Sequence, residues 1–100
     1  MFIVGSKYRG DKGVYCGRPT ALGNPYSISA NMTRDQACDA YEAHFNKVKD
    51  GDPVIRALLT ALMRVHRDKG TVTLLCYCAP KRCHCDTIAR YLNWKLENEA

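Results

Sequence analysis

The chain has 100 residues, the size of one domain, and 46% of them are hydrophobic and 25% charged, as in a globular protein. No apolar run approaches the ~18 residues of a membrane span, and the N-terminus lacks the apolar core and cleavage pattern of a secretory signal. We therefore expect a single domain over residues 1–100, without membrane contact, in the cytoplasm, where its six cysteines are thiols rather than a disulfide framework.

The net charge of +5 is unevenly distributed along the chain. Four basic residues stand against one acidic residue in residues 1–26, and Lys81 and Arg82 add two more inside a cysteine-rich segment. Such an excess is typical of a plain solvated surface, of a site for the phosphate of a small nucleotide, and of a surface for a nucleic-acid backbone. Charge alone leaves these three interpretations open.

The first elements in chain order are a strand and a long loop. Residues 1–5 (MFIVG) have the pattern of a short buried strand that ends at a glycine. Residues 7–32 are rich in Gly, Pro, Ser and Asn, and VYCGR (14–18) is their strand-like part. Because a loop of this length is uncommon in a compact domain unless it carries function, we expect this one to be functional.

Two helices follow the loop. Thr33 and Gln36 form a capping-box pattern, which predicts a helix that begins at Thr33. Asp52 and Pro53 predict the start of the next helix, as an acidic cap and a proline at the first helical position, and Gly70 predicts its end. The apolar residues expected to be buried are Ala37, Tyr41, Phe45 and Val48 in the first helix and Ile55, Leu58, Leu59, Leu62 and Val65 in the second.

The C-terminal part predicts a strand, a turn and a helix. Residues 71–78 (TVTLLCYC) are apolar or β-branched and uncharged, which predicts a central strand buried on both faces. After the turn, Asp86 or a neighbour caps a last helix with Ile88, Tyr91, Leu92 and Leu96 inward. This order predicts a small three-layer α/β domain with a short, mostly parallel sheet, whose ligands bind where the strands end.

The segment CGRPTALGNPY is the first of two stretches that carry chemistry. Gly17 and Gly23 permit tight or positive-φ backbone, and the two prolines restrict their neighbours. Arg18, held between glycine and proline, can offer a bidentate donor to a phosphate or carboxylate. Asn24 can bind a base edge or a ribose. The alternative is a structural loop, in which Arg18 bonds nearby carbonyls and Asn24 closes a turn.

The segment LLCYCAPKRCHCD is the second stretch, and it has three interpretations. A zinc site would take its ligands from Cys76, Cys78, Cys83 and either His84 or Cys85. A nucleophile would be Cys83 or Cys78, activated by His84. In the interpretation that we favour, Cys76 and Cys78 are small buried strand residues. Cys83 and His84 then line a turn whose backbone N–H groups, at the start of the last helix, bind an anion.

Together the two motifs resemble domain of unknown function 4326, a family of small domains in phages and bacteria. Its members read G-R-P-S-x-L-G-N-P-F and then, after a capped helix, L-x-C-W-C-x-P-x-x-C-H-G-D. The resemblance covers roughly residues 14–92. The matching positions are Gly17, Arg18, Pro19, Leu22, Gly23, Asn24, Pro25, Cys76, Cys78, Pro80, Cys83, His84 and Asp86.

Two positions depart from the family pattern. Tyr77 stands where the family usually has Trp, and Cys85 stands where it usually has Gly. The resemblance implies that Cys85 is not a required metal ligand, which leaves Cys76, Cys78, Cys83 and His84 as the zinc alternative. The family is similar to Rossmann-like nucleotide-binding domains, and phages often carry such proteins against host signalling. The resemblance therefore implies a Rossmann-like fold and a site position rather than a reaction.

We expect the protein to bind a phosphate-bearing small ligand, a nucleotide or an ADP-ribose-like signal, as a phage-encoded protein that sequesters it. Arg18 would hold the phosphate, assisted by Lys81 or Arg82, with no cofactor required. The expected ligand-binding residues are Gly17, Arg18, Pro19, Gly23, Asn24, Tyr26, Lys81, Arg82, Cys83 and His84.

Two other functions remain open at this stage. A hydrolase or glycosyl-transfer enzyme acting on the same ligand would use His84 as acid or base, Cys83 as nucleophile and Asp86 to orient His84. A zinc-containing module would bind nucleic acid or protein through the basic surface, although the six tyrosines are scattered rather than interleaved with basic residues. A second copy of the chain can complete a shallow pocket, and the sequence leaves the oligomeric state open.

Overall fold

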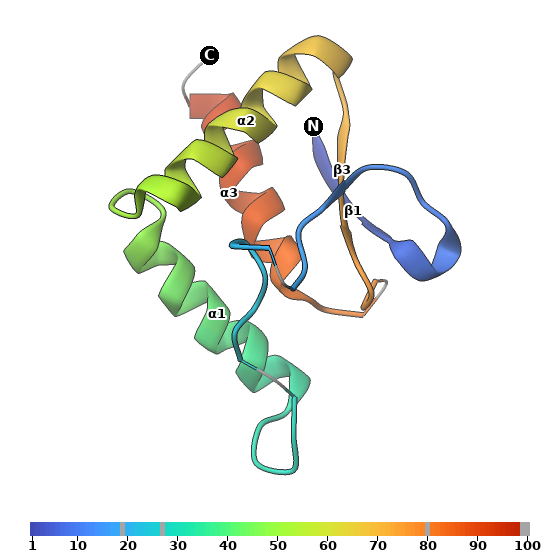
Figure 1. Ribbon diagram of the computed structural model, residues 1–100, viewed down its shortest axis with the longest axis vertical. Helices are drawn as coiled ribbons and strands as arrows, with labels where there is room; N and C mark the ends of the chain where they lie inside the picture. The colour runs from blue at the N-terminus through green and yellow to red at the C-terminus, as the bar shows by residue number, and fades with distance from the viewer. Residues whose placement is uncertain (19, 27, 80, 99–100) are drawn as a thin grey trace.

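A computed structural model describes residues 1–18, 20–26, 28–79 and 81–98. Within these residues three strands and three helices form an α/β fold, which confirms the predicted class (Figure 1). None of the described helices is long and apolar enough to cross a membrane. In chain order the elements are β1 (Phe2–Ser6), a 3-10 turn (Lys7–Arg9), β2 (Val14–Tyr15), α1 (Arg34–Val48), α2 (Pro53–Lys69), β3 (Val72–Cys76) and α3 (His84–Asn98).

The sheet is fully parallel, and β3 lies at its centre between β1 and β2. The register pairs Phe2 with Val72 and Val14 with Leu74. The apolar, uncharged sequence of β3 thus does occupy the central position predicted for it, although the strand ends at Cys76, two residues earlier than expected. The strand-like patch after residue 13 contributes only the two-residue strand β2.

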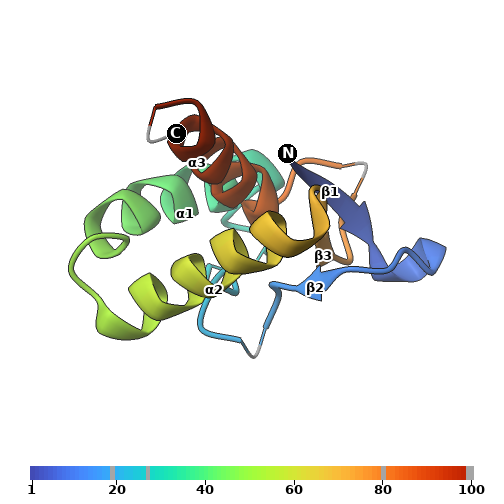
Figure 2. The same cartoon turned by 90° about the horizontal axis from the view of Figure 1, so that it is seen from above.

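The helices cover one face of the sheet. Phe2, Val72 and Leu74 point into the helix-covered core, each at most 3% exposed. On the opposite face Ile3 is 42% exposed, and Gly13 packs against Thr73. Figure 2 shows α1, α2 and α3 on one side of the strands. The three-layer, Rossmann-like detail of the fold prediction is therefore not confirmed.

The helix starts follow from their capping residues. The hydroxyl of Thr33 accepts from the Gln36 N–H at 3.1 Å, and the Gln36 side chain accepts from the Thr33 N–H, so the predicted capping box forms. Asp52 caps α2 and Gly70 ends it with a φ of 87°. The start of α3 was predicted at Asp86 or a neighbour, and the helix begins at His84.

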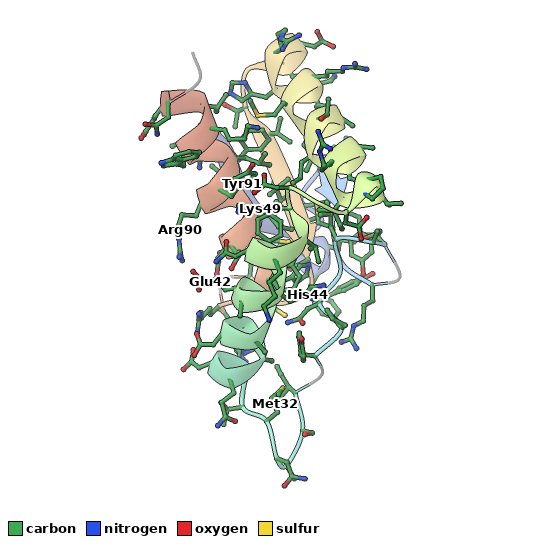
Figure 3. The ribbon with its side chains drawn as sticks, turned by 90° about the vertical axis from the view of Figure 1, so that its left-hand side faces the viewer. Met32, Glu42, His44, Lys49, Arg90 and Tyr91 are labelled. Carbon is green, nitrogen blue, oxygen red and sulfur yellow. The ribbon has the colours of Figure 1, made fainter. Side chains whose placement is uncertain are left out.

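The α1 and α3 helices pack through an aromatic contact with a polar rim. The Phe45 and Tyr91 rings meet edge to face with centroids 5.5 Å apart. Arg90 of α3 bonds Glu42 of α1 at 3.2 Å, and Lys49 lies 5.7 Å from the Tyr91 ring (Figure 3). Of the predicted core, the fully buried members are Ala37, Tyr41, Phe45, Ile55, Leu59, Leu62, Ile88 and Leu92, while Val48, Leu58, Val65, Tyr91 and Leu96 are partly buried.

Substitution of Gly13 tests how closely the backbone at residue 13 approaches the sheet. A methyl group at Gly13 would overlap the carbonyl of Thr73, whereas one at Gly51 would meet open space. We expect Gly13→Ala to lower the free energy of unfolding by more than ~1 kcal/mol and Gly51→Ala to change it by less than about 0.5 kcal/mol. Urea unfolding of the two variants measures both values, and equal stabilities would contradict this packing.

Candidate functional site

A cleft of about 290 Å³ lies at the carboxyl end of the strands. Residues of both sequence motifs and of α1 line it. Arg34 and His84, the first residues of α1 and α3, line it together, so two helix N-termini meet there. Of the predicted ligand-binding residues, those that line the cleft are Gly17, Arg18, Asn24, Tyr26, Arg82, Cys83 and His84.

The remaining predicted residues lie elsewhere. Lys81 is exposed and Gly23 lies behind Arg18, and neither lines the cleft. Pro19, like the motif residue Pro80, lies outside the described residues. The Cys-rich turn therefore contributes Arg82, Cys83 and His84 to the cleft wall.

Close packing fixes the backbone around Arg18. A Cβ at Gly23 would lie 2.7 Å from the Arg18 nitrogen, and one at Gly17 would lie 2.5 Å from the Tyr15 hydroxyl. Among the described residues only two other glycines have positive φ, so these two permit close approach rather than a left-handed turn. The Tyr15 hydroxyl donates to the Arg18 carbonyl at 2.6 Å. The backbone of Arg18 is therefore held by Gly23 on one side and by the Tyr15 hydroxyl on the other.

The Asn24 side chain anchors the loop to α1. Its amide donates to the Ala37 carbonyl at 3.3 Å, and its oxygen accepts from the Tyr26 N–H at 2.8 Å. The Tyr41 hydroxyl adds a bond to the Leu22 carbonyl at 2.8 Å. Asn24 thus performs the turn-closing role left open at the sequence level, and it sets the position of the Tyr26 ring beside the cleft.

Arg34 lines the cleft, although the sequence motifs did not predict it as a site residue. It follows the Thr33 cap, and that capping box was the signal that placed it at a helix start. Its guanidinium donates to the Arg82 carbonyl at 3.2 Å. Arg82 in turn pairs with Asp39 at 2.7 Å and Asp35 at 3.0 Å, and both carboxylates raise its pKa. Arg82 therefore clamps the Cys-rich turn onto α1.

His84 is a buried, hydrogen-bonded residue of the cleft floor. It is 8% exposed, and its Nε2–H donates to the Cys16 carbonyl at 2.7 Å. Burial lowers its pKa below the ordinary value, so the imidazole is neutral at pH 7. Asp86, predicted to orient His84 in an enzyme, accepts instead from the Cys83 N–H at 3.1 Å.

Three buried thiols gather under the cleft. The sulfurs of Cys76, Cys83 and Cys85 all lie within 4.8 Å of one another, and those of Cys76 and Cys83 are 3.0 Å apart. The Cys85 thiol also donates to the Leu75 carbonyl at 3.8 Å. Hydrogen bonds from Cys83 and Cys85 lower the pKa of Cys76, and the same contact with Cys76 raises the pKa of Cys83 to about 12.

This cluster differs from the zinc set predicted from sequence. It contains Cys76, Cys83 and Cys85, which were all candidates from the sequence, although the family resemblance set Cys85 aside, and it leaves out Cys78 and His84. Cys78 is partly exposed, and the His84 Nε2 is bonded to a carbonyl. Cys85 is fully buried because α3 begins at His84, which turns the next side chain into the core.

The fold and the cleft define a small α/β protein with a parallel sheet and a ligand-sized cleft at the carboxyl end of its strands. A family model described as Domain of unknown function (DUF4326) matches residues 5–94. The chain belongs to this family, as the paired motifs predicted. No curated protein and no solved structure matches it.

The lowered pKa of His84 predicts a pH dependence of stability. Because the unfolded chain takes up a proton at this residue near pH ~6.5 before the folded chain does, stability is full above that pH. It falls as the pH drops toward the folded pKa, by at most about 1.4 kcal/mol per pH unit. Urea unfolding between about pH 7.5 and 5.5 should show this loss in the wild type and in His44→Gln. An equal loss in His84→Gln would contradict the assignment.

Proposed function

We propose that the protein binds a phosphate-bearing small ligand, a nucleotide or an ADP-ribose-like molecule, in this cleft. The observation that carries the proposal is the convergence of Arg18, Arg34 and the N-terminal ends of α1 and α3 on one cavity. Its volume of about 290 Å³ is near the lower end of the ~300–1,000 Å³ range of small-ligand pockets.

The arginines suit the phosphate end of such a ligand. A guanidinium offers planar, paired donors that match phosphate oxygens. Arg18 comes from the loop after β2 and Arg34 from the start of α1, so a bound phosphate would join the loop to the helix. Helix N-termini add partial positive charge at the same end of the cleft. Arg82, paired with two aspartates, acts here as a positioning residue.

Aromatic side chains suit the base end. Tyr15, Tyr26 and Tyr77 line the cleft, and Tyr77 and Tyr26 are 48% and 36% exposed. Flat, partly exposed rings of this kind stack on nucleobases. The Lys7 ammonium lies 4.6 Å from the Tyr15 ring centre and adds positive charge at this rim. The cleft would thus offer aromatic rings to a base as well as guanidinium groups to a phosphate.

The contacts of the cleft floor favour binding over catalysis. His84 donates to a backbone carbonyl and Asp86 accepts from a backbone N–H, so both side chains of the expected acid–base pair hold the turn. The hydrolase and the nucleic-acid module remain predictions from the sequence. In this proposal the protein works in the cytoplasm, and a phage-encoded copy would sequester a host signal.

Calorimetric titration with AMP, ADP and ADP-ribose tests the proposal. We expect one of them to bind, and Arg18→Ala to weaken that affinity about tenfold or more, because a hydrogen bond to a charged group contributes about 1.5 kcal/mol or more. Arg56→Ala, on the exposed face of α2 and away from the cleft, is the matched control and should bind like the wild type.

Two outcomes would overturn the proposal. One is an Arg18→Ala affinity within about twofold of the wild type, or no binding of any of the three ligands. The other is chemical conversion of the ligand, which chromatography of the mixture after heat release would reveal. Recovery of unchanged ligand supports a binding protein.

A further inference from the structure

Three cysteine side chains meet under the cleft, and hydrophobic packing alone does not require cysteine at these positions. Cys76 ends β3, and Cys83 and Cys85 lie at the start of α3, so two elements bring the three side chains together. All three side chains are at most 3% exposed, and their sulfurs lie close to one another. We propose that Cys76, Cys83 and Cys85 form a zinc-binding site.

The sulfurs lie close to the spacing of ligands on one ion and need small shifts to reach it. At a Zn–S distance of ~2.3 Å two sulfurs on the same tetrahedral ion are ~3.8 Å apart, and they can never be more than ~4.6 Å apart. The cluster lies within 4.8 Å, and its closest pair, Cys76 and Cys83 at 3.0 Å, opens to the tetrahedral separation with a shift under about 1 Å. Side-chain rotation is enough for such a change.

The donor set selects the ion. Three thiolates without a carboxylate suit soft cations, of which zinc and copper(I) are the common ones. With zinc the cluster keeps a net charge of −1, and with copper(I) it keeps −2. Because all three sulfurs are buried, the smaller residual charge is favoured.

An ion has a path to the cluster and an open coordination position. Cys76 and Cys83 line the cleft, so zinc can reach them from solvent. On binding, three thiols release three protons and three sulfur–zinc bonds form, so the affinity falls as the pH falls. Three protein ligands leave the fourth position of a tetrahedral ion for water or a ligand atom. The proposal does not depend on nucleotide binding.

Metal analysis of the full-length, untagged protein, purified with reductant and without chelator, tests the site. We expect about one zinc per chain by elemental analysis. After the zinc is stripped, Co²⁺ should give the visible bands of a tetrahedral site and a thiolate-to-cobalt charge-transfer band with the intensity of three sulfurs. This readout needs only the wild-type protein.

Two cysteine variants separate this ligand set from the one predicted from sequence. Cys85→Ser should lose about a third of the charge-transfer intensity and bind Co²⁺ at least about tenfold more weakly. Cys78→Ser, in the cleft wall but outside the cluster, should keep both. Circular dichroism of each variant confirms that it is folded before metal is added.

The proposal is wrong if the wild-type protein contains no zinc and gives no cobalt bands. It is also wrong if the bands are lost in Cys78→Ser but not in Cys85→Ser, or if Cys76 and Cys83 form a disulfide in protein kept under reductant. Arg18→Ala should retain its zinc whether or not it binds nucleotide. Failure of the metal site is therefore distinguishable from failure of the proposed ligand.

Discussion

The backbone of Cys16 ties the two motif segments together, and the cleft depends on it. Its N–H donates to the Leu75 carbonyl at 3.0 Å, which continues the β2–β3 pairing, and its carbonyl accepts from the His84 Nε2 at 2.7 Å. One residue thus joins the loop after β2 to the central strand and to the first turn of α3. These two bonds hold the arginine-bearing loop and the Cys-rich turn in one frame, together with the contacts that each segment makes to α1.

This tie also explains why a histidine occupies the buried start of α3. A buried carbonyl without a donor costs about 1–3 kcal/mol, and the neutral imidazole supplies that donor. The lowered pKa keeps the ring neutral while it does so. A histidine beside a cysteine invites a catalytic interpretation from sequence, but this one is committed to the backbone of another segment, 68 residues away along the chain.

The sequence predicted the features that depend on local chemistry. Thr33, Asp52 and Gly70 set helix ends through their own side chains or backbone, and the apolar run of β3 was enough to place it at the sheet centre. The convergence of both motifs at the carboxyl ends of the strands followed from the parallel topology. These features need no knowledge of distant contacts.

The features that the sequence did not predict depend on the residue at which a helix begins and on hydrogen-bond or ion-pair partners from other elements. The sequence predicted a cap at Asp86 or a neighbour, and the actual start of α3 at His84 decides that Cys85 points into the core and joins the thiol cluster. Arg82 looked like a phosphate ligand, but its partners Asp35 and Asp39 come from another helix. For Asn24 the sequence left the turn-closing role open, but its partner, a carbonyl of α1, could not be predicted. Tertiary packing alone assigns these pairs.

The two proposed sites make opposite electrostatic demands, and the arginines reconcile them. Zinc with three thiolates retains a net charge of −1, which would repel a phosphate in the cleft above it. Two guanidinium groups, those of Arg18 and Arg34, line that cleft in addition to the aspartate-paired Arg82. In the proposed metal-bound state these arginines would offset the residual charge of the cluster, so an anion would still be attracted to the cleft above it.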